Sequence, residues 1–221
     1  MRGDPEASGP SRRVLFLPGA SGDGRFWRPV ADRLPPCETI LLDWPGLGHV
    51  PPRPQIQGFD DLAALALGHA DREVDLVAQS MGGVVAVLAT LARPEAVRRL
   101  VLTATSGGLR LAGSGAQDWR EEYRREFPGA APWATEYRID LTDRIASIRC
   151  PTLLLWSDAD PISPLAVGET LARRLPDAEL VVIPGAEHMF ARDRAGEVAP
   201  HIARHLFGVR WSGPARRSVV R

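Results

Sequence analysis

Residues 75–83 read DLVAQSMGG, an apolar run that leads directly into a serine, two glycines and a helix-like run at residues 84–90. A strand, a tight turn and a helix in this order are typical of a nucleophile elbow, in which the backbone of Ser80 is strained so that its hydroxyl stands clear of the sheet. The strand and the helix pass close together at such a turn, and the small residues Ala78 and Gly82 meet that requirement. The amino end of a helix also favours negative charge that develops nearby. The pattern predicts a nucleophilic serine, with a serine that only caps a helix as the alternative.

A serine hydroxyl is a weak nucleophile unless a base removes its proton, so the elbow predicts a histidine and an orienting carboxylate further along the chain. Both residue types occur directly after strand-like runs, as Asp158 and Asp160 and then as His188. Parallel strands end at one edge of a sheet, which is where ligands bind in open α/β sheets. We therefore expect Ser80, His188 and one of the two aspartates to meet at that edge.

Short apolar runs alternate with longer amphipathic segments along the chain, which is the pattern of a parallel sheet with helices on both faces. The runs that read as buried strands are residues 14–17, 39–42, 74–78, 100–103, 152–156 and 180–183. The segments that read as helices are residues 27–34, 60–70, 81–92, 165–175 and 191–207. The predicted fold class is α/β, doubly wound, with a mostly parallel sheet of about six strands.

One interval interrupts this alternation. Residues 107–147 contain no good strand, but glycines precede a helix-like stretch at residues 117–127 that carries aromatic side chains. We interpret this insertion as a short lid over a site, with a packed surface excursion as the alternative. The rest of the predicted organisation is a single domain over residues 14–207, a flexible amino-terminal segment at residues 1–13 and a flexible basic tail at residues 208–221.

All basic residues of the 221-residue chain are arginines, and asparagine is also absent. Without lysine the chain has no Walker-type phosphate loop and no lysine Schiff base, and without asparagine it has no Cys-His-Asn site. Because 27 basic residues balance 27 acidic ones, we expect no nucleic-acid partner. The two cysteines, Cys37 and Cys150, do not suggest a disulfide framework or a zinc site. No apolar run has the length of a signal peptide or a membrane span, so we expect a cytoplasmic protein.

Five segments in this order resemble the α/β-hydrolase superfamily: LPGA at residues 17–20, DWPGLG at residues 43–48, the elbow, WSDAD at residues 156–160 and GAEH at residues 185–188. Members of this family carry the nucleophile, the acid and the histidine in this chain order. The resemblance covers about residues 14–207. It implies an α/β-hydrolase fold and a carboxylesterase-like serine hydrolase with a small lid.

The resemblance also implies roles for individual residues. It implies Asp160 as the acid, because the family's acid is the second aspartate of this turn, and leaves Asp158 as a turn residue. It implies an oxyanion hole formed by the backbone N–H groups of Ala20 and Met81. The sequence departs from the family pattern at Pro18, where histidine is usual. The elbow also begins with alanine, and the acid turn has a serine, where glycine is usual.

Large apolar residues flank the predicted catalytic loops. Phe26, Trp27, Leu47 and Phe190 are placed there, as is Met81. We expect these side chains to line an apolar acyl pocket, with ordinary packing as the alternative.

The remaining histidines receive no catalytic role. His49 reads as a loop residue, and His69 as a surface residue on a predicted helix. His201 and His205 are four residues apart on the last predicted helix, a spacing that can hold a metal, but no carboxylate or cysteine partner is evident. A solvated helix face is the preferred interpretation, and no metal is predicted.

The predicted function is hydrolysis of carboxylic esters of small to medium, fairly apolar molecules through an acyl-enzyme, without a cofactor. Cleavage of a carbon–carbon bond, or a lyase step, with the same triad is the first alternative, and thioester or lactone hydrolysis is also open. A non-catalytic binder of small ligands is the alternative from another class. The sequence gives no indication of an oligomeric state.

Overall fold

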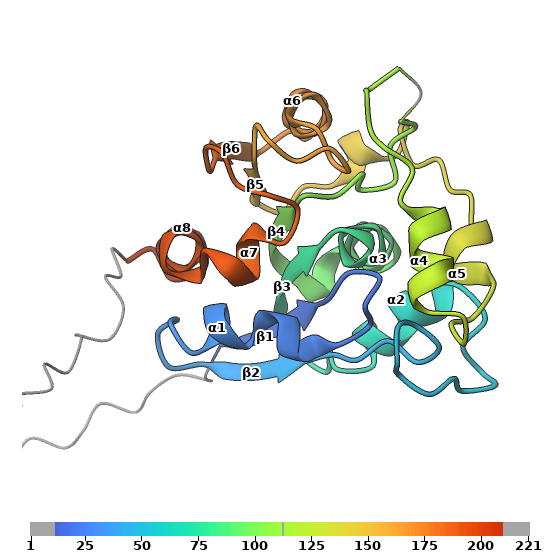
Figure 1. Ribbon diagram of the computed structural model, residues 1–221. Helices are drawn as coiled ribbons and strands as arrows, with labels where there is room; N and C mark the ends of the chain where they lie inside the picture. The colour runs from blue at the N-terminus through green and yellow to red at the C-terminus, as the bar shows by residue number, and fades with distance from the viewer. Residues whose placement is uncertain (1–11, 112, 210–221) are drawn as a thin grey trace, which may run out of the picture.

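The strands form one parallel sheet (Figure 1). The structure, a computed structural model, describes residues 12–111 and 113–209. Its strands are β1 (Arg13–Leu17), β2 (Glu38–Leu41), β3 (Val74–Gln79), β4 (Val97–Thr103), β5 (Thr152–Trp156) and β6 (Ala178–Val182). They lie in the order β2-β1-β3-β4-β5-β6, and every neighbouring pair is parallel. The predicted α/β class with a parallel sheet is confirmed. The flexible ends that we expect fall almost entirely on residues 1–11 and 210–221, which lie outside the described residues.

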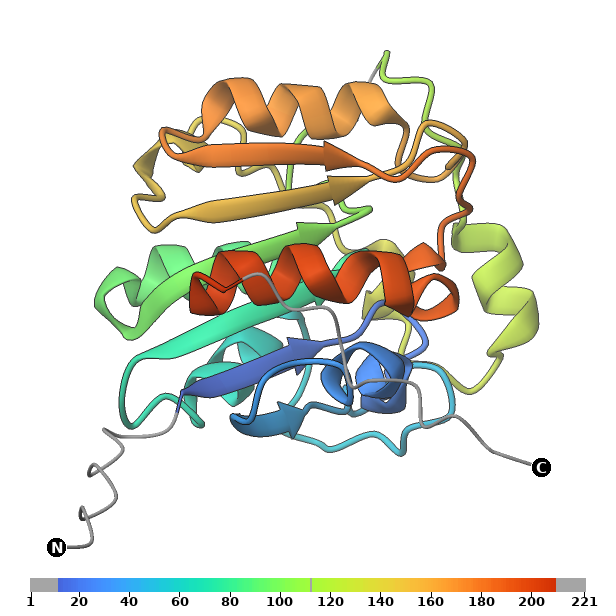
Figure 2. The ribbon, with the colours of Figure 1, turned by 90° about the vertical axis from the view of Figure 1, so that its left-hand side faces the viewer.

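Helices cover both faces of the sheet because successive side chains of a strand point to opposite sides. Leu15 and Leu17 of β1 belong to a core cluster with α2 (Phe59–Leu67), α3 (Met81–Ala92) and α6 (Leu165–Arg174). Val14 and Phe16 belong to a second cluster with α1 (Arg28–Ala31), α7 (Phe190–Asp193) and α8 (Ala195–Phe207). Figure 2 shows α8 lying across the second face. No helix among the described residues has the length and apolar composition needed to cross a membrane.

The insertion at residues 107–147, here called the cap, contains α4 (Arg120–Glu126), α5 (Trp133–Glu136) and the 3₁₀ turn η3 (Ile145–Ser147). Figure 2 shows α4 beyond the carboxyl ends of the strands. The backbone N–H of Ala131 donates to the carbonyl of Gly46 at 2.7 Å. The ring of Tyr137 stacks on Phe59 of α2, with ring centroids 4.2 Å apart. The cap is therefore packed against the domain at the edge where we expect the site.

Three predicted helices differ from those observed. In place of the helix expected at residues 27–34, the structure has the 3₁₀ turn η1 (Gly24–Trp27) followed by the short helix α1, which ends at Ala31. A separate 3₁₀ turn, η2 (Pro94–Ala96), follows α3. The segment at residues 191–207 is broken at Arg194, whose guanidinium donates to the carbonyls of Pro184 and Gly185. The stretch at residues 117–127 becomes helical only at Arg120, where the carboxylate of Asp118 accepts from the N–H of Arg120, one of the first N–H groups of the helix, which have no partner within it.

Candidate active site

Ser80 lies in the turn between β3 and α3, with a φ of 52° and a ψ of −122°. This left-handed conformation is unusual for a residue with a side chain and carries strain of about 1–3 kcal/mol. The surrounding backbone holds it, because the N–H of Ser80 donates to the carbonyl of Thr103 and its carbonyl accepts from the N–H of Gly83, both at 2.9 Å. A Cβ at Gly82 would lie 2.3 Å from the carbonyl oxygen of Pro18, so only glycine allows α3 to pass this close to the loop after β1. The backbone at residue 80 thus has the geometry of a nucleophile elbow.

The structure brings Ser80, His188 and Asp160 together in one chain of hydrogen bonds. The hydroxyl oxygen of Ser80 lies 3.0 Å from Nε2 of His188, and Nδ1 of His188 lies 2.7 Å from Oδ2 of Asp160. A carboxylate can only accept, so Nδ1 carries the proton and donates to Asp160. In neutral His188, Nε2 is then left to accept the proton of the Ser80 hydroxyl.

Asp160 is buried, and its second oxygen accepts from the backbone N–H groups of Ile162 at 2.8 Å and Ser163 at 3.1 Å. Burial alone raises the pKa of this carboxyl. The hydrogen bond from His188, the charge of that ring and the two backbone donors outweigh burial, so the pKa lies below its ordinary value. Asp160 therefore stays ionised at neutral pH and can hold the ring of His188 in the required tautomer.

Asp158 has a different position from Asp160. It is exposed, and its carboxylate accepts from the backbone N–H of Gly185 at 2.6 Å. The neighbouring Ser157 is buried, and its hydroxyl donates to the carbonyl of Ala186 and accepts from the N–H of the same residue. These contacts join the loop after β5 to the loop after β6, which carries the histidine. They therefore fix the acid and the base relative to each other.

The two backbone N–H groups expected in the oxyanion hole belong to segments that other residues hold in place. Met81 is the first residue of α3, so its N–H has no partner within the helix. Ala20 lies in the loop after β1, where Trp44 donates its indole N–H to the carbonyl of Pro18 at 2.7 Å and Trp27 donates to the carbonyl of Leu17 at 3.0 Å. The two indoles brace a loop in which proline replaces the usual histidine.

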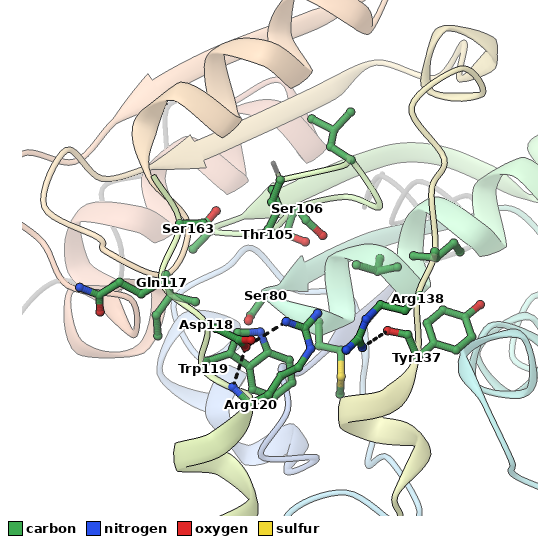
Figure 3. A pocket seen from close by; sticks show the side chains of 18 of the residues that line it. Ser80, Thr105, Ser106, Gln117, Asp118, Trp119, Arg120, Tyr137, Arg138 and Ser163 are labelled. Carbon is green, nitrogen blue, oxygen red and sulfur yellow. Dashed lines mark hydrogen bonds and ion pairs between the residues drawn. The ribbon is translucent and has the colours of Figure 1, made fainter. Parts of the chain in front are cut away.

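A cavity of about 330 Å³ opens from Ser80 and Met81. Its walls come from α3, from the segment after β4, from the loop after β5 and from the cap. Figure 3 shows Ser163 on one side of Ser80, and Arg120 and Arg138 of the cap on the other. The hydroxyl of Ser163 is buried and has no hydrogen-bond partner among the described residues. The cavity thus presents polar and charged groups as well as apolar ones.

The structure contradicts the predicted acyl pocket. Phe26, Trp27, Leu47 and Phe190 are buried, and none of them lines the cavity. Phe26, Trp27 and Phe190 pack in the core cluster beneath α8, and Leu47 packs in the opposite cluster. Of the predicted apolar wall only Met81 lines the cavity. Ordinary packing, the alternative reading of these residues, is therefore the correct one.

Most of the cavity wall was not predicted from the sequence. Its cap residues include Trp119, Arg120 and Arg138, which lie in or beside short helices. The aromatic residues of the insertion were the only signal that could have located this wall. The arginines of the insertion show no sequence pattern that indicates which of them line the cavity.

The other histidines do not line the cavity beside Ser80. His49 is exposed and packs edge-on against Phe127, and His69 is half-buried just beyond the end of α2. His201 and His205 are half-buried, and burial lowers the pKa of both. Since Nε2 of His205 is buried without a hydrogen-bond partner among the described residues, the solvated face that we expected there is wrong. The part of the chain that the structure describes contains no cluster of three His, Cys, Asp or Glu residues that could hold a metal ion.

Comparison with known proteins identifies the family to which this chain belongs. The model of the alpha/beta hydrolase family matches residues 14–201, and the chain belongs to that family. It is 26% identical to the pimeloyl-[acyl-carrier protein] methyl ester esterase of Neisseria meningitidis, over 80% of this chain and 86% of that protein. It is 29% identical to the polyketide synthase ThaQ of Burkholderia thailandensis, over 80% of this chain but only 11% of that protein. A solved esterase of Thermogutta terrifontis with malate bound has a TM-score of 0.74 and 23% identity and covers 91% of this chain and 92% of its own, which indicates a shared fold.

Proposed function

We propose that this member of the alpha/beta hydrolase family is a serine hydrolase that cleaves carboxylic esters of small to medium molecules through an acyl-enzyme. The observation that carries the proposal is the hydrogen-bonded chain from the Ser80 hydroxyl through His188 to Asp160. The cavity beside Ser80 supports it, because about 330 Å³ lies at the lower end of the range for small-molecule sites. The esterase among the relatives is consistent with the same class of reaction.

In the proposed reaction Oγ of Ser80 attacks the carbonyl carbon of the ester while its proton moves to Nε2 of His188. Asp160 accepts the hydrogen bond from Nδ1 and stabilises the imidazolium that forms. The N–H groups of Met81 and Ala20 donate to the oxyanion of the tetrahedral intermediate, an effect worth about 10² to 10³ in rate for each donor. The intermediate collapses, and the alcohol leaves with the proton from Nε2. A water molecule, deprotonated by the same nitrogen, then attacks the acyl carbon. The bond from that carbon to Oγ of Ser80 breaks, Oγ takes the proton back from Nε2, and the acid is released.

A fluorophosphonate probe followed by mass spectrometry tests this proposal. We expect one adduct, on Ser80, and no adduct in Ser80→Ala. Turnover of p-nitrophenyl acetate should fall by several orders of magnitude in Ser80→Ala or His188→Ala, up to about 10⁶ by analogy with other triads. Ser106→Ala is the matched control, because Ser106 lines the same cavity and its hydroxyl accepts from the backbone of Gly108 rather than contacting the histidine.

The outcomes separate the alternative functions. Undiminished esterase activity in Ser80→Ala, or labelling of another residue, would refute the mechanism. Labelling of Ser80 together with cleavage of a diketone but not of esters would favour the carbon–carbon hydrolase or lyase. Ligand binding without labelling or turnover of any substrate would favour the non-catalytic binder.

A further inference from the structure

The charge of the cavity wall does not fit the fairly apolar substrate expected from the sequence. Three arginines, Arg110, Arg120 and Arg138, line the cavity, and Asp118 is the only acidic residue among the lining residues. The whole chain is neutral, so this excess of positive charge is local. A local excess of one sign in a partly enclosed site attracts ligands of the opposite sign.

Two of the three arginines have carboxylate partners. The guanidinium of Arg110 donates to Asp140 through Nε and Nη2, and that of Arg120 donates to Asp118 at 2.9 Å. The pKa of Asp118 lies below its ordinary value because the backbone N–H and the side chain of Arg120 donate to it, and the charge of Arg138 adds to this lowering. Asp118 is therefore ionised and offsets the charge of one arginine.

Arg138 has no carboxylate within ion-pair distance in the described part of the chain. Its Nη1 donates to the backbone carbonyls of Thr135 at 2.8 Å and Tyr137 at 3.0 Å. Both bonds are local, so they orient the guanidinium without neutralising it. The adjacent Tyr137 is held by its stacking on Phe59. The positive charge left over in the wall is thus that of Arg138. Its Nε and Nη2 have no hydrogen-bond partner among the described residues and can donate to a ligand.

The position of this charge relates it to the reaction. Figure 3 shows the side chain of Arg138 extending from the cap toward the part of the cavity that contains Ser80. The side chain is exposed, so water solvates its charge until a ligand fills the cavity. A planar guanidinium with two free donor groups matches the oxygens of a carboxylate or a phosphate.

We propose that the substrate carries an anionic group, a carboxylate or a phosphate, that Arg138 binds while the scissile carbonyl lies at Ser80. This inference rests on the proposed ester hydrolysis and specifies its substrate. The anion accepts from Arg138 in the ground state and in the transition state alike, so this contact selects substrates and takes no part in bond cleavage.

Pairs of esters that differ only in charge test the inference. One series comprises monomethyl esters of straight-chain dicarboxylic acids of increasing length, and a second replaces the free carboxylate by a phosphate monoester. The neutral partners are methyl alkanoates of matched length. kcat/KM is measured for the unaltered chain, for Arg138→Gln and for Arg138→Lys. Arg124→Gln is the matched control, because Arg124 is an exposed arginine of α4 that does not line the cavity.

We expect the unaltered chain to prefer an anionic ester over its neutral partner. Arg138→Gln should lower kcat/KM for the anionic ester by about 10- to 100-fold, as for other hydrogen bonds to charged groups, and leave the neutral ester nearly unchanged. Arg138→Lys should retain part of the preference, Arg124→Gln should retain all of it, and added salt should weaken it. The series with the higher kcat/KM distinguishes a carboxylate from a phosphate ligand.

The results that would overturn this inference differ from those that would overturn the proposed function. With Ser80 labelled by the fluorophosphonate, equal turnover of charged and neutral esters at every length would remove the inference and leave the function. An equal loss on both kinds of ester in Arg138→Gln would also remove it. Absence of labelling at Ser80 would remove the proposed function and the inference with it. Thermal unfolding of each variant checks that the folded state is intact.

Discussion

Replacement of Gly82 by alanine tests whether the close approach of α3 to β1 positions the nucleophile. The new Cβ would lie 2.3 Å from the carbonyl oxygen of Pro18 and 2.6 Å from that of Leu17. A carbon and a carbonyl oxygen in contact are normally separated by roughly 3.3 Å, so the two backbones must move apart by about 1 Å. The atoms that are met belong to the backbone, so no side-chain rotation relieves the clash.

We expect the clash in Gly82→Ala to lower the free energy of unfolding by about 1–3 kcal/mol, as at other overpacked sites. The higher helix propensity of alanine offsets up to about 1 kcal/mol of this loss. Its effect on turnover should be larger, because the displaced segments carry Ser80 and Ala20, and a shift of 1 Å at a reacting centre lowers the rate by about 10²-fold. Urea unfolding measures the first quantity, and kcat/KM for p-nitrophenyl acetate measures the second.

Gly196→Ala is the matched control for this experiment. Gly196 is the second residue of α8, as Gly82 is of α3, and a Cβ there would meet no atom within 4 Å. It should leave turnover unchanged and stability unchanged or raised. If Gly82→Ala were as stable and as active as Gly196→Ala, the argument that close packing fixes the elbow would be refuted.

Three further substitutions have definite expected outcomes. Asp160→Asn should lower kcat by about 10⁴-fold, because the ring of His188 loses its tautomer support, whereas Asp158→Asn should have a far smaller effect in the same esterase assay. Ser163→Ala should leave the free energy of urea unfolding unchanged or raise it by up to about 1 kcal/mol, since the hydroxyl has no protein partner among the described residues; a clear loss would contradict this. Burial lowers the pKa of His205, so the unfolded chain binds more protons than the folded one, and the free energy of unfolding should fall as the pH drops below about 6.5. His205→Leu should reduce this fall, as measured by urea unfolding at a series of pH values between about 8 and 5. An unchanged dependence of the free energy of unfolding on pH in this variant would contradict the prediction.

The sheet and the elbow could be predicted because short-range rules determine them. Each strand contains a short run of apolar residues, and the observed strands agree with the predicted ones to within a few residues. The elbow requires particular small residues at fixed offsets from Ser80, and those offsets can be read directly from the sequence. The common edge for Ser80, Asp160 and His188 follows from parallel strand direction alone. The roles of these residues in catalysis remain predictions.

The cavity wall could not be predicted because long-range packing determines it. Phe26 and Phe190 are close in sequence to the predicted catalytic loops, but their side chains turn into the core cluster beneath α8. Proximity along the chain says nothing about which side of the sheet a side chain faces once a loop has turned. Arg138 was missed for a related reason, since the segment after α5 has no periodicity that would show which residues face the site.

The attachment of the cap bears on how variants of Arg138 can be interpreted. Near its start the N–H of Gln117 donates to the carbonyl of Pro161, in the loop that carries Asp160, at 2.8 Å, and further along the N–H of Ala131 donates to the carbonyl of Gly46. Backbone groups make both attachments, so they persist when a side chain on the cap is changed. Loss of the guanidinium should therefore alter the charge of the cavity without moving its wall. A change in selectivity for anionic esters in Arg138→Gln can then be assigned to the charge itself.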